Sequence, residues 1–177
     1  FFQAAGGMGF VQLDLDWVPG KFEQDILIKP VFDFSSVYID PDCRPLDGTD
    51  MEYAFITDDY VRKSDFEQQY PNAEAVNFKD SETAKGWGDE DYIRLASYYY
   101  LEREYEDIHL LSSGAVVNGK QLKDIRDQMQ AAGLPVPEVL DTRKNEVKTV
   151  KWCKLNGVEV LEKRDWLGSY IPIIPFY

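Results

Sequence analysis

The sequence has few of the residues that usually carry enzyme chemistry. Its 177 residues include one histidine and two cysteines. His109 lies in a strand-like run, and neither Cys43 nor any serine stands in a nucleophile motif such as GxSxG. Cys43 and Cys153 lack the spacing of a zinc module or a disulfide scaffold, which fits a reducing compartment and leaves one disulfide open. We therefore expect no catalytic and no metal-binding residues.

The sequence also lacks positive charge and long apolar runs. It has 19 basic and 32 acidic residues and a net charge of -13, which disfavours tight, non-specific binding to nucleic acid because phosphates are repelled. The most apolar windows, such as YIPIIPFY, are broken by proline and fall short of the roughly 20 residues that span a membrane. No secretory signal is visible. The 44% of hydrophobic residues is enough for one module with a core.

Cofactor-binding glycine motifs are missing as well. The glycines of AAGGMGF form neither GxGxxG nor GxxxxGK[ST] after a strand-like run, so we expect no cofactor. The chain begins at Phe1 without a methionine and stops at Tyr177 inside an apolar run, whereas domain boundaries are usually polar. We therefore expect residues 1–177 to be a single module that is an internal fragment of a larger protein.

Strand patterns dominate what is present, and residues 8–57 are rich in them. Residues 10–17 alternate apolar and polar side chains, the period of a half-buried strand. Pro19 and Gly20 then predict a turn, and Pro30 in the next strand-like run predicts an edge strand or a bulge. The apolar positions of the first strand are Val11, Leu13, Leu15 and Trp17.

Two short helices are predicted. The first covers about 62–70, where Val61 and Phe66 have the spacing of a hydrophobic staple and Pro71 ends the helix. The second covers about 119–132, with Asn118 as its cap and Gly133 in the position that follows a helix end. The apolar residues at helical spacing in the second helix are Leu122, Ile125, Met129 and Ala132.

The remaining segments read as strands. Residues 91–112 predict two strands joined near Glu104 to Glu106, and residues 169–177 predict a terminal strand. Residues 146–163 predict a hairpin, because Asn156-Gly157 is the pair that a type I′ turn favours. The fold class is therefore α+β, mainly antiparallel β-strands with two short helices.

An acidic stretch, DFSSVYIDPDCRPLDGTDME at residues 33–52, is a candidate calcium loop. Counted from Asp40 as an EF-hand, Arg44 falls at a ligand position, Pro45 at the glycine position and Met51 at the final carboxylate. The pattern fails where it is most demanding. Turn chemistry, in which aspartates accept hydrogen bonds from nearby backbone N–H groups, accounts for the acids better. A calcium-stabilised, adhesin-like module is the weaker alternative.

Aromatic and charged clusters leave a second alternative open. Tyr98, Tyr99 and Tyr100, together with four tryptophans and many acids, would suit a β-rich carbohydrate-binding or glycoside-hydrolase-like domain. Strands also favour aromatics, so core and cross-strand packing is the preferred interpretation. The lysines of KTVKWCK alternate with apolar residues and indicate the wet face of a hairpin rather than a nucleic-acid site.

The order of several segments resembles a known family. DFSSVYIDPDC, EYAFITDDYVRKSDFEQQYP, DEDYIRLASYYYLE, KTVKWCKLNGVEVLE and GSYIPIIPFY together resemble the wing region of portal proteins from tailed double-stranded DNA bacteriophages, of the short-tailed, Salmonella-infecting type. The resemblance runs over nearly the whole chain and contains no catalytic motif. Arg62 stands where many relatives carry a serine cap, which departs from the pattern at the start of the first helix.

The resemblance implies a structural virion protein and no enzyme. Subunits of such portals form a dodecameric ring at one capsid vertex, the head-to-tail connector, through which DNA is packaged and ejected. The wing projects outward, and the partners are identical subunits, coat protein, terminase, tail or adaptor proteins and DNA in the channel. The location implied is the virion, with assembly in the bacterial cytoplasm and no membrane. The elements that close the ring lie outside this fragment, so we expect it to be monomeric alone.

Overall fold

The computed structural model describes residues 7–44, 47–74, 86–88 and 91–176, and of residues 58 and 59 the backbone alone. Antiparallel strands predominate and two short α-helices accompany them, so the predicted α+β class is confirmed. The chain divides into two compact units. Unit 1 comprises Phe1–Leu101 and Thr149–Tyr177, and unit 2 comprises Glu102–Lys148. That residues 1–177 act as one module of a larger protein stays a prediction.

Sheet A of unit 1 has three strands in the order β2-β1-β9. The strands are β1 (Gly9–Trp17), β2 (Gln24–Val31) and β9 (Ile173–Phe176). Between β1 and β2 the Lys21 N–H donates to the Val18 carbonyl at 3.0 Å, and Gly20 has a φ of 77°. Proline followed by a residue of positive φ defines a type II turn, so the predicted turn at Pro19-Gly20 is confirmed. Pro30 lies in β2, an edge strand, as predicted.

Sheet B has the order β3-β4-β5-β7-β8 and extends through both units, because β5 and β7 contribute residues to each. Its strands are β3 (Val37–Ile39), β4 (Tyr53–Arg62), β5 (Tyr92–Leu111), β7 (Val139–Leu155) and β8 (Val160–Asp165), and the short strand β6 (Val116–Asn118) pairs with β5 outside this order. A 3-10 helix, η1 (Phe34–Ser36), precedes β3. The register between β4 and β5 shifts between Ile56 and Asp59, as at a β-bulge.

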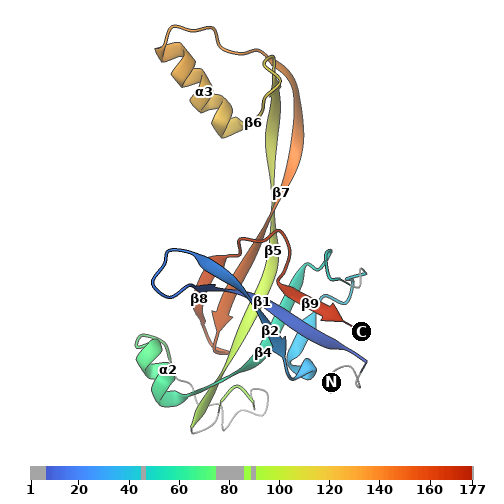
Figure 1. Ribbon diagram of the computed structural model, residues 1–177, viewed down its shortest axis with the longest axis vertical. Coiled ribbons are helices and arrows are strands. Elements are labelled where there is room, and N and C mark those ends of the chain that lie inside the picture. The colour runs from blue at the N-terminus through green and yellow to red at the C-terminus, as the bar shows by residue number, and fades with distance from the viewer. Residues whose placement is uncertain (1–6, 45–46, 75–85, 89–90, 177) are drawn as a thin grey trace. The chain divides into compact units, whose positions relative to one another are not determined.

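The core of unit 1 lies between sheet A and sheet B. In Figure 1 the β1–β2 hairpin crosses the strands of sheet B, and the two facing surfaces share one cluster of buried side chains. Sheet A contributes the alternate residues of its strands that point toward sheet B. The cluster contains Phe10, Val31, Met51, Ala54, Ile56, Tyr99, Val150, Trp152, Ile171 and Ile173.

Helix α2 (Lys63–Gln69) is the helix expected at about 62–70. Its N-cap residue, Arg62, makes no side-chain capping hydrogen bond. The helix is instead fixed by packing, because Phe66 is fully buried against Ile93 and Leu95, and Val61 packs on the same cluster. Val61 and Phe66 occupy the positions of a hydrophobic staple, as the sequence predicted.

Unit 2 contains the ends of β5 and β7, the short strand β6 (Val116–Asn118) and helix α3 (Gly119–Ala131). Asn118 and Gln121 form a reciprocal capping box, which confirms the predicted cap. Gly133 has a φ of 65°, the left-handed conformation that commonly follows a helix end. The small core of unit 2 is formed by Leu111, Val117 and Leu122, with Ile125 and Val139 packed against it.

Two sequence predictions about strands were wrong. Residues 92–111 form the single strand β5, without a junction near Glu104 to Glu106. The charged residues there suggested a loop, but a ribbon exposed on both faces has no need of apolar alternation. Its polar side chains pair across the strands instead, as Arg103 does with Glu146 at 3.0 Å.

The hairpin between β7 and β8 is present, but its turn is not type I′. That turn needs positive φ at both central residues, and among the described residues only glycines have it. Leu155 at the end of β7 pairs with Val160 at the start of β8, so the loop between the two strands has four residues. The buried Asn156 side chain accepts hydrogen bonds from the N–H groups of Val158 at 3.1 Å and Glu159 at 3.0 Å. Asn156 therefore forms an Asx-type turn through its side chain.

Candidate functional site

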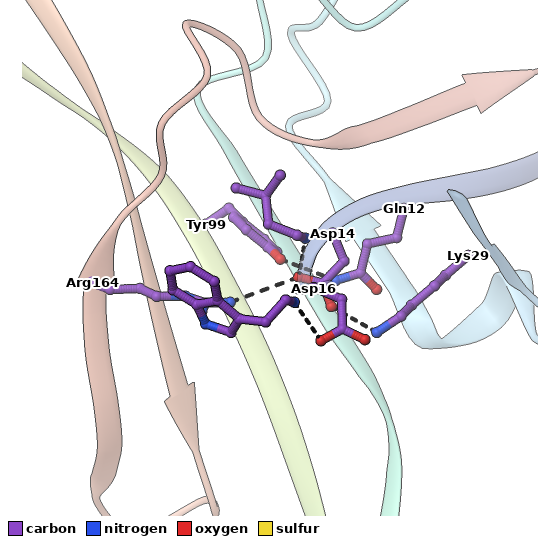
Figure 2. Close-up of polar contacts among 8 residues, drawn as sticks. Gln12, Asp14, Asp16, Lys29, Tyr99 and Arg164 are labelled. Carbon is purple, nitrogen blue, oxygen red and sulfur yellow. Dashed lines mark hydrogen bonds and ion pairs between the residues drawn. The ribbon is translucent and has the colours of Figure 1, made fainter. Parts of the chain in front are cut away.

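A polar cleft of about 340 Å³ lies between the two sheets of unit 1. Its lining residues come from β1, β2, β4, β5, β7 and β8, and Figure 2 shows the contacts at its centre. Lys29 Nζ donates to Asp14 Oδ2 at 2.6 Å, and Arg164 approaches Asp14 Oδ1 at 3.8 Å. Gln12 Nε2 donates to the Tyr99 hydroxyl at 3.0 Å. The network thus connects sheet A to two strands of sheet B.

Asp14 is the electrostatic centre of this cleft. Partial burial disfavours its charged form, but hydrogen bonds from Lys29 and the Leu15 N–H, with the charges of Lys29 and Arg164, outweigh the burial and lower its pKa. The Arg164 guanidinium also lies 4.2 Å from the centre of the Trp152 ring. An acid held ionised between two bases is suited to joining the sheets and poorly suited to accepting or donating a proton.

The alternation of side chains along a strand would have predicted part of this network from the sequence. Asp14 and Lys29 fall on the polar faces of β1 and β2, and the sheet register places Asp14 opposite Leu27, one diagonal step from Lys29. Counting back from the Pro19-Gly20 turn would pair Asp14 with Asp25, whereas strand pairing begins at Trp17 and Gln24, so the observed register differs by two residues from that count. Tyr99 and Arg164 come from distant segments, and no local pattern predicts their approach to β1.

The acidic stretch at 33–52 uses its aspartates in turns, as predicted. Asp40 is 7% exposed, and its carboxylate accepts from the Asp42 N–H at 3.0 Å and the Glu52 N–H at 3.1 Å. Asp33 and Asp47 likewise accept hydrogen bonds from residues two further along the chain. Among the described residues, no group of three or more His, Cys, Asp or Glu side chains is arranged to hold a metal ion.

The two cysteines lie in different surroundings, and the described structure leaves both as free thiols. Burial raises the pKa of the Cys43 thiol to about 11, assisted by a hydrogen bond to Asp50 and by the charges of Asp50, Asp40 and Asp47. Burial also raises the pKa of Cys153. Reactive cysteines need the opposite shift, because the thiolate is the nucleophile.

The other candidate side chains have structural partners. His109 is a strand residue of unit 2, and its Nδ1 lies 2.9 Å from the Thr142 hydroxyl. Tyr99 is buried in the core, while Tyr98 and Tyr100 stack with centroids 5.4 Å apart. Cross-strand packing of the tyrosines is therefore confirmed, with Phe55 at 6.2 Å from Tyr98. In the part of the chain that the structure describes, no helix is long and apolar enough to cross a membrane.

Comparison with known proteins defines the class to which this chain belongs. The family model for "Phage P22-like portal protein" matches residues 1–177, and the chain therefore belongs to that family. The portal protein of Acyrthosiphon pisum secondary endosymbiont phage 1 is 26% identical over 189 residues. The match covers 98% of this chain and 25% of that relative, so the chain spans about a quarter of the relative's length. The resemblance to phage portal proteins of this type is confirmed.

Proposed function

We propose that the chain is the outward-projecting wing of a portal subunit and has a structural, non-catalytic role. The observation that carries this proposal is the match of the P22-like portal family over residues 1–177. The whole subunit would assemble into a dodecameric ring at one vertex of the capsid. Double-stranded DNA would be packaged and ejected through the channel of that ring.

The contacts in the candidate site support a structural role. The carboxylate of Asp14 is engaged by Lys29, and Gln12 is engaged by Tyr99. Asp40 is engaged by backbone N–H groups of its own loop. These interactions stabilise the arrangement of strands and turns, and the lowered pKa of Asp14 keeps that carboxylate ionised rather than poised for proton transfer.

The partners proposed for the full-length protein are identical subunits, coat protein, terminase, tail or adaptor proteins, and DNA in the channel. The net charge of -13 favours a place for this segment away from the DNA, because an acidic surface repels phosphates. The protein would be located at the portal vertex of the virion, after assembly in the host cytoplasm.

Electron microscopy of the full-length protein tests the proposal. Purified full-length protein is expected to form closed rings with a central channel, and sedimentation should show one large species. A preparation that remains monomeric at concentrations of about 10 μM, a range in which weaker subunit contacts become populated, would overturn the proposal.

A further inference from the structure

The outer face of sheet A, directed away from sheet B, is apolar except for Gln24 at one end. Residues of β1, β2 and β9 alternate, so those pointing toward sheet B include Phe10, Val31 and Ile173 of the core. The residues between them point outward. The outer face consists of Val11, Leu13, Leu15, Trp17, Ile26, Ile28, Pro30, Ile174 and Phe176, with Gln24 at its end.

This arrangement reverses the usual polarity of a two-layer fold. Gln12, Asp14 and Lys29 point into the cleft between the sheets, whereas most apolar residues of the same strands, Phe10 and Val31 excepted, lie on the opposite face. Antiparallel sheets with one solvated face ordinarily place polar residues on that face. The reversal indicates that the outer face is covered when the protein works.

The exposed apolar area of this face is large. Trp17 is 59% exposed, Ile26 69% and Ile28 71%. Ile174 is 38% exposed and Phe176 is 39% exposed. Typical side-chain areas scaled by such fractions give on the order of 600 Å² of exposed apolar surface, at the top of the range for patches on monomers. A standard interface buries about 800 Å² per partner, so this face supplies most of one side.

The charge distribution indicates which partner fits. The chain has a net charge of -13, so two copies repel each other over most of their surface. The outer face of sheet A carries no charged residue at any described position. Two copies of this chain can therefore approach there with little repulsion. A nucleic acid has no basic group to bind on this face.

The edge of the sheet supports the same assignment. β2 is an edge strand, and its pairing with β1 runs from Gln24 to Val31 without a bulge. Natural proteins usually protect such an edge with bulges, with charges or by covering it. Of these devices, β2 has Pro30 near its end and the charges of Asp25 and Lys29 on its inward face, whereas the outward side chains Ile26 and Ile28 are apolar and leave the outer face of this edge without charge.

We propose that the outer face of sheet A is a contact surface between neighbouring copies of the full-length subunit. The proposal rests on the proposed ring, and it assigns one surface of that ring to named residues. The area falls short of a complete standard interface, so the remainder of each subunit supplies the rest. This is also why the isolated chain is expected to stay monomeric.

The test uses the full-length protein with Ile28→Lys, which places a charge on the outer face midway along β2. The expected result is about a tenfold or greater loss of rings in sedimentation, as for a central interface residue. The matched control is Asp25→Lys, which introduces the same lysine on the opposite face of β2. The control is expected to form rings as the wild type does. Normal assembly of Ile28→Lys, or equal loss in the control, would overturn the assignment.

Photo-cross-linking distinguishes whether a second copy of the subunit or another segment of the same chain covers the outer face of sheet A. A benzoyl-phenylalanine at Ile26 in the full-length ring is expected to give adducts at the mass of two subunits. Cross-links confined within one subunit would show that another segment of the same chain covers the face, and would overturn the proposal. If the wild-type protein forms no ring, the proposed function fails. If rings form but Ile28→Lys assembles normally, this inference alone fails.

Discussion

The two compact units of the chain use different means to stay folded. Unit 1 encloses a core between two sheets, in which Phe10, Tyr99 and Trp152 are nearly inaccessible to solvent. The described core of unit 2 is built on Leu111, Val117 and Leu122. Apolar burial is the main favourable term in folding, so unit 1 has far more of it available than unit 2.

Unit 2 relies more heavily on local interactions. The capping box of α3 satisfies two backbone donors at the start of that helix. The strands of its ribbon differ in charge, with acids concentrated in residues 102–107 of β5 and bases in 143–148 of β7. Exposed ion pairs across the ribbon, such as Arg103 of β5 with Glu146 of β7, contribute about 0–1 kcal/mol each. We therefore expect unit 2 to be the less stable part of the chain.

The largest expected effect is in the core of unit 1. Phe10→Ala removes a side chain that is 2% exposed between the sheets, and it is expected to lower the free energy of unfolding by about 3–5 kcal/mol. Urea unfolding followed by tryptophan fluorescence measures this. Phe22→Ala, at a fully exposed aromatic in the turn, is the control and should change stability by less than about 0.5 kcal/mol. A loss below 1 kcal/mol for Phe10→Ala would contradict the two-sheet core.

The next largest effect is expected in unit 2, and it tests whether the two units unfold separately. Leu122→Ala removes the main contact of α3 and is expected to cost unit 2 about 2–4 kcal/mol. Hydrogen exchange should then accelerate at Leu111 and Val117 while Leu95 in unit 1 stays protected. Lys123→Ala, on the exposed side of the same helix, should change neither. Equal acceleration in both units would show that they unfold together.

The helix cap provides a smaller effect on unit 2. Asn118→Ala removes the side chain that accepts from the Gln121 N–H at 2.9 Å, and it should destabilise α3 by about 1 kcal/mol. Circular dichroism and exchange rates within α3 measure the loss. Lys120→Ala alters the same turn without touching the cap. If both variants behave alike, the cap makes no specific contribution.

The smallest effect concerns pH and unit 1. The pKa of Asp14 is lowered in the folded state, so its ionised form stabilises the protein above the unfolded value of about 3.9. That contribution is lost as pH falls through the folded pKa. Wild type should exceed Asp14→Asn in stability near neutral pH, and the difference should vanish in acid. A difference that persists unchanged into acid would contradict the ionised Asp14.

Patterns that depend on neighbours in sequence could be predicted. The alternation of β1, the turn at Pro19-Gly20, the staple of Val61 with Phe66 and the cap at Asn118 were all visible in the sequence, because each is decided within a few residues.

Features that depend on contacts between distant segments could not be predicted from the sequence. The sequence showed that one face of β1 is apolar, but the choice of the polar face to meet sheet B depends on Tyr99 and Arg164 far along the chain. Asn156-Gly157 carried the signal of a two-residue turn, yet Asn156 is buried and donates to the Glu74 carbonyl at 3.1 Å. With that tertiary contact, Asn156 closes the loop through its side chain and does not have the positive φ that a type I′ turn needs at both central residues, whereas Gly157 does, with a φ of 88°.

The central claim is that this chain acts through surfaces covered in an assembly. Hydrogen exchange of β2 in full-length rings, compared with the same protein dissociated into folded subunits, tests it most directly. The backbone amides of residues 24–29 and of Val31 are expected to exchange about tenfold or more slowly in the ring, while those on the charged face of α3 do not change. Rings in which β2 exchanges as fast as in the dissociated subunits would contradict the claim.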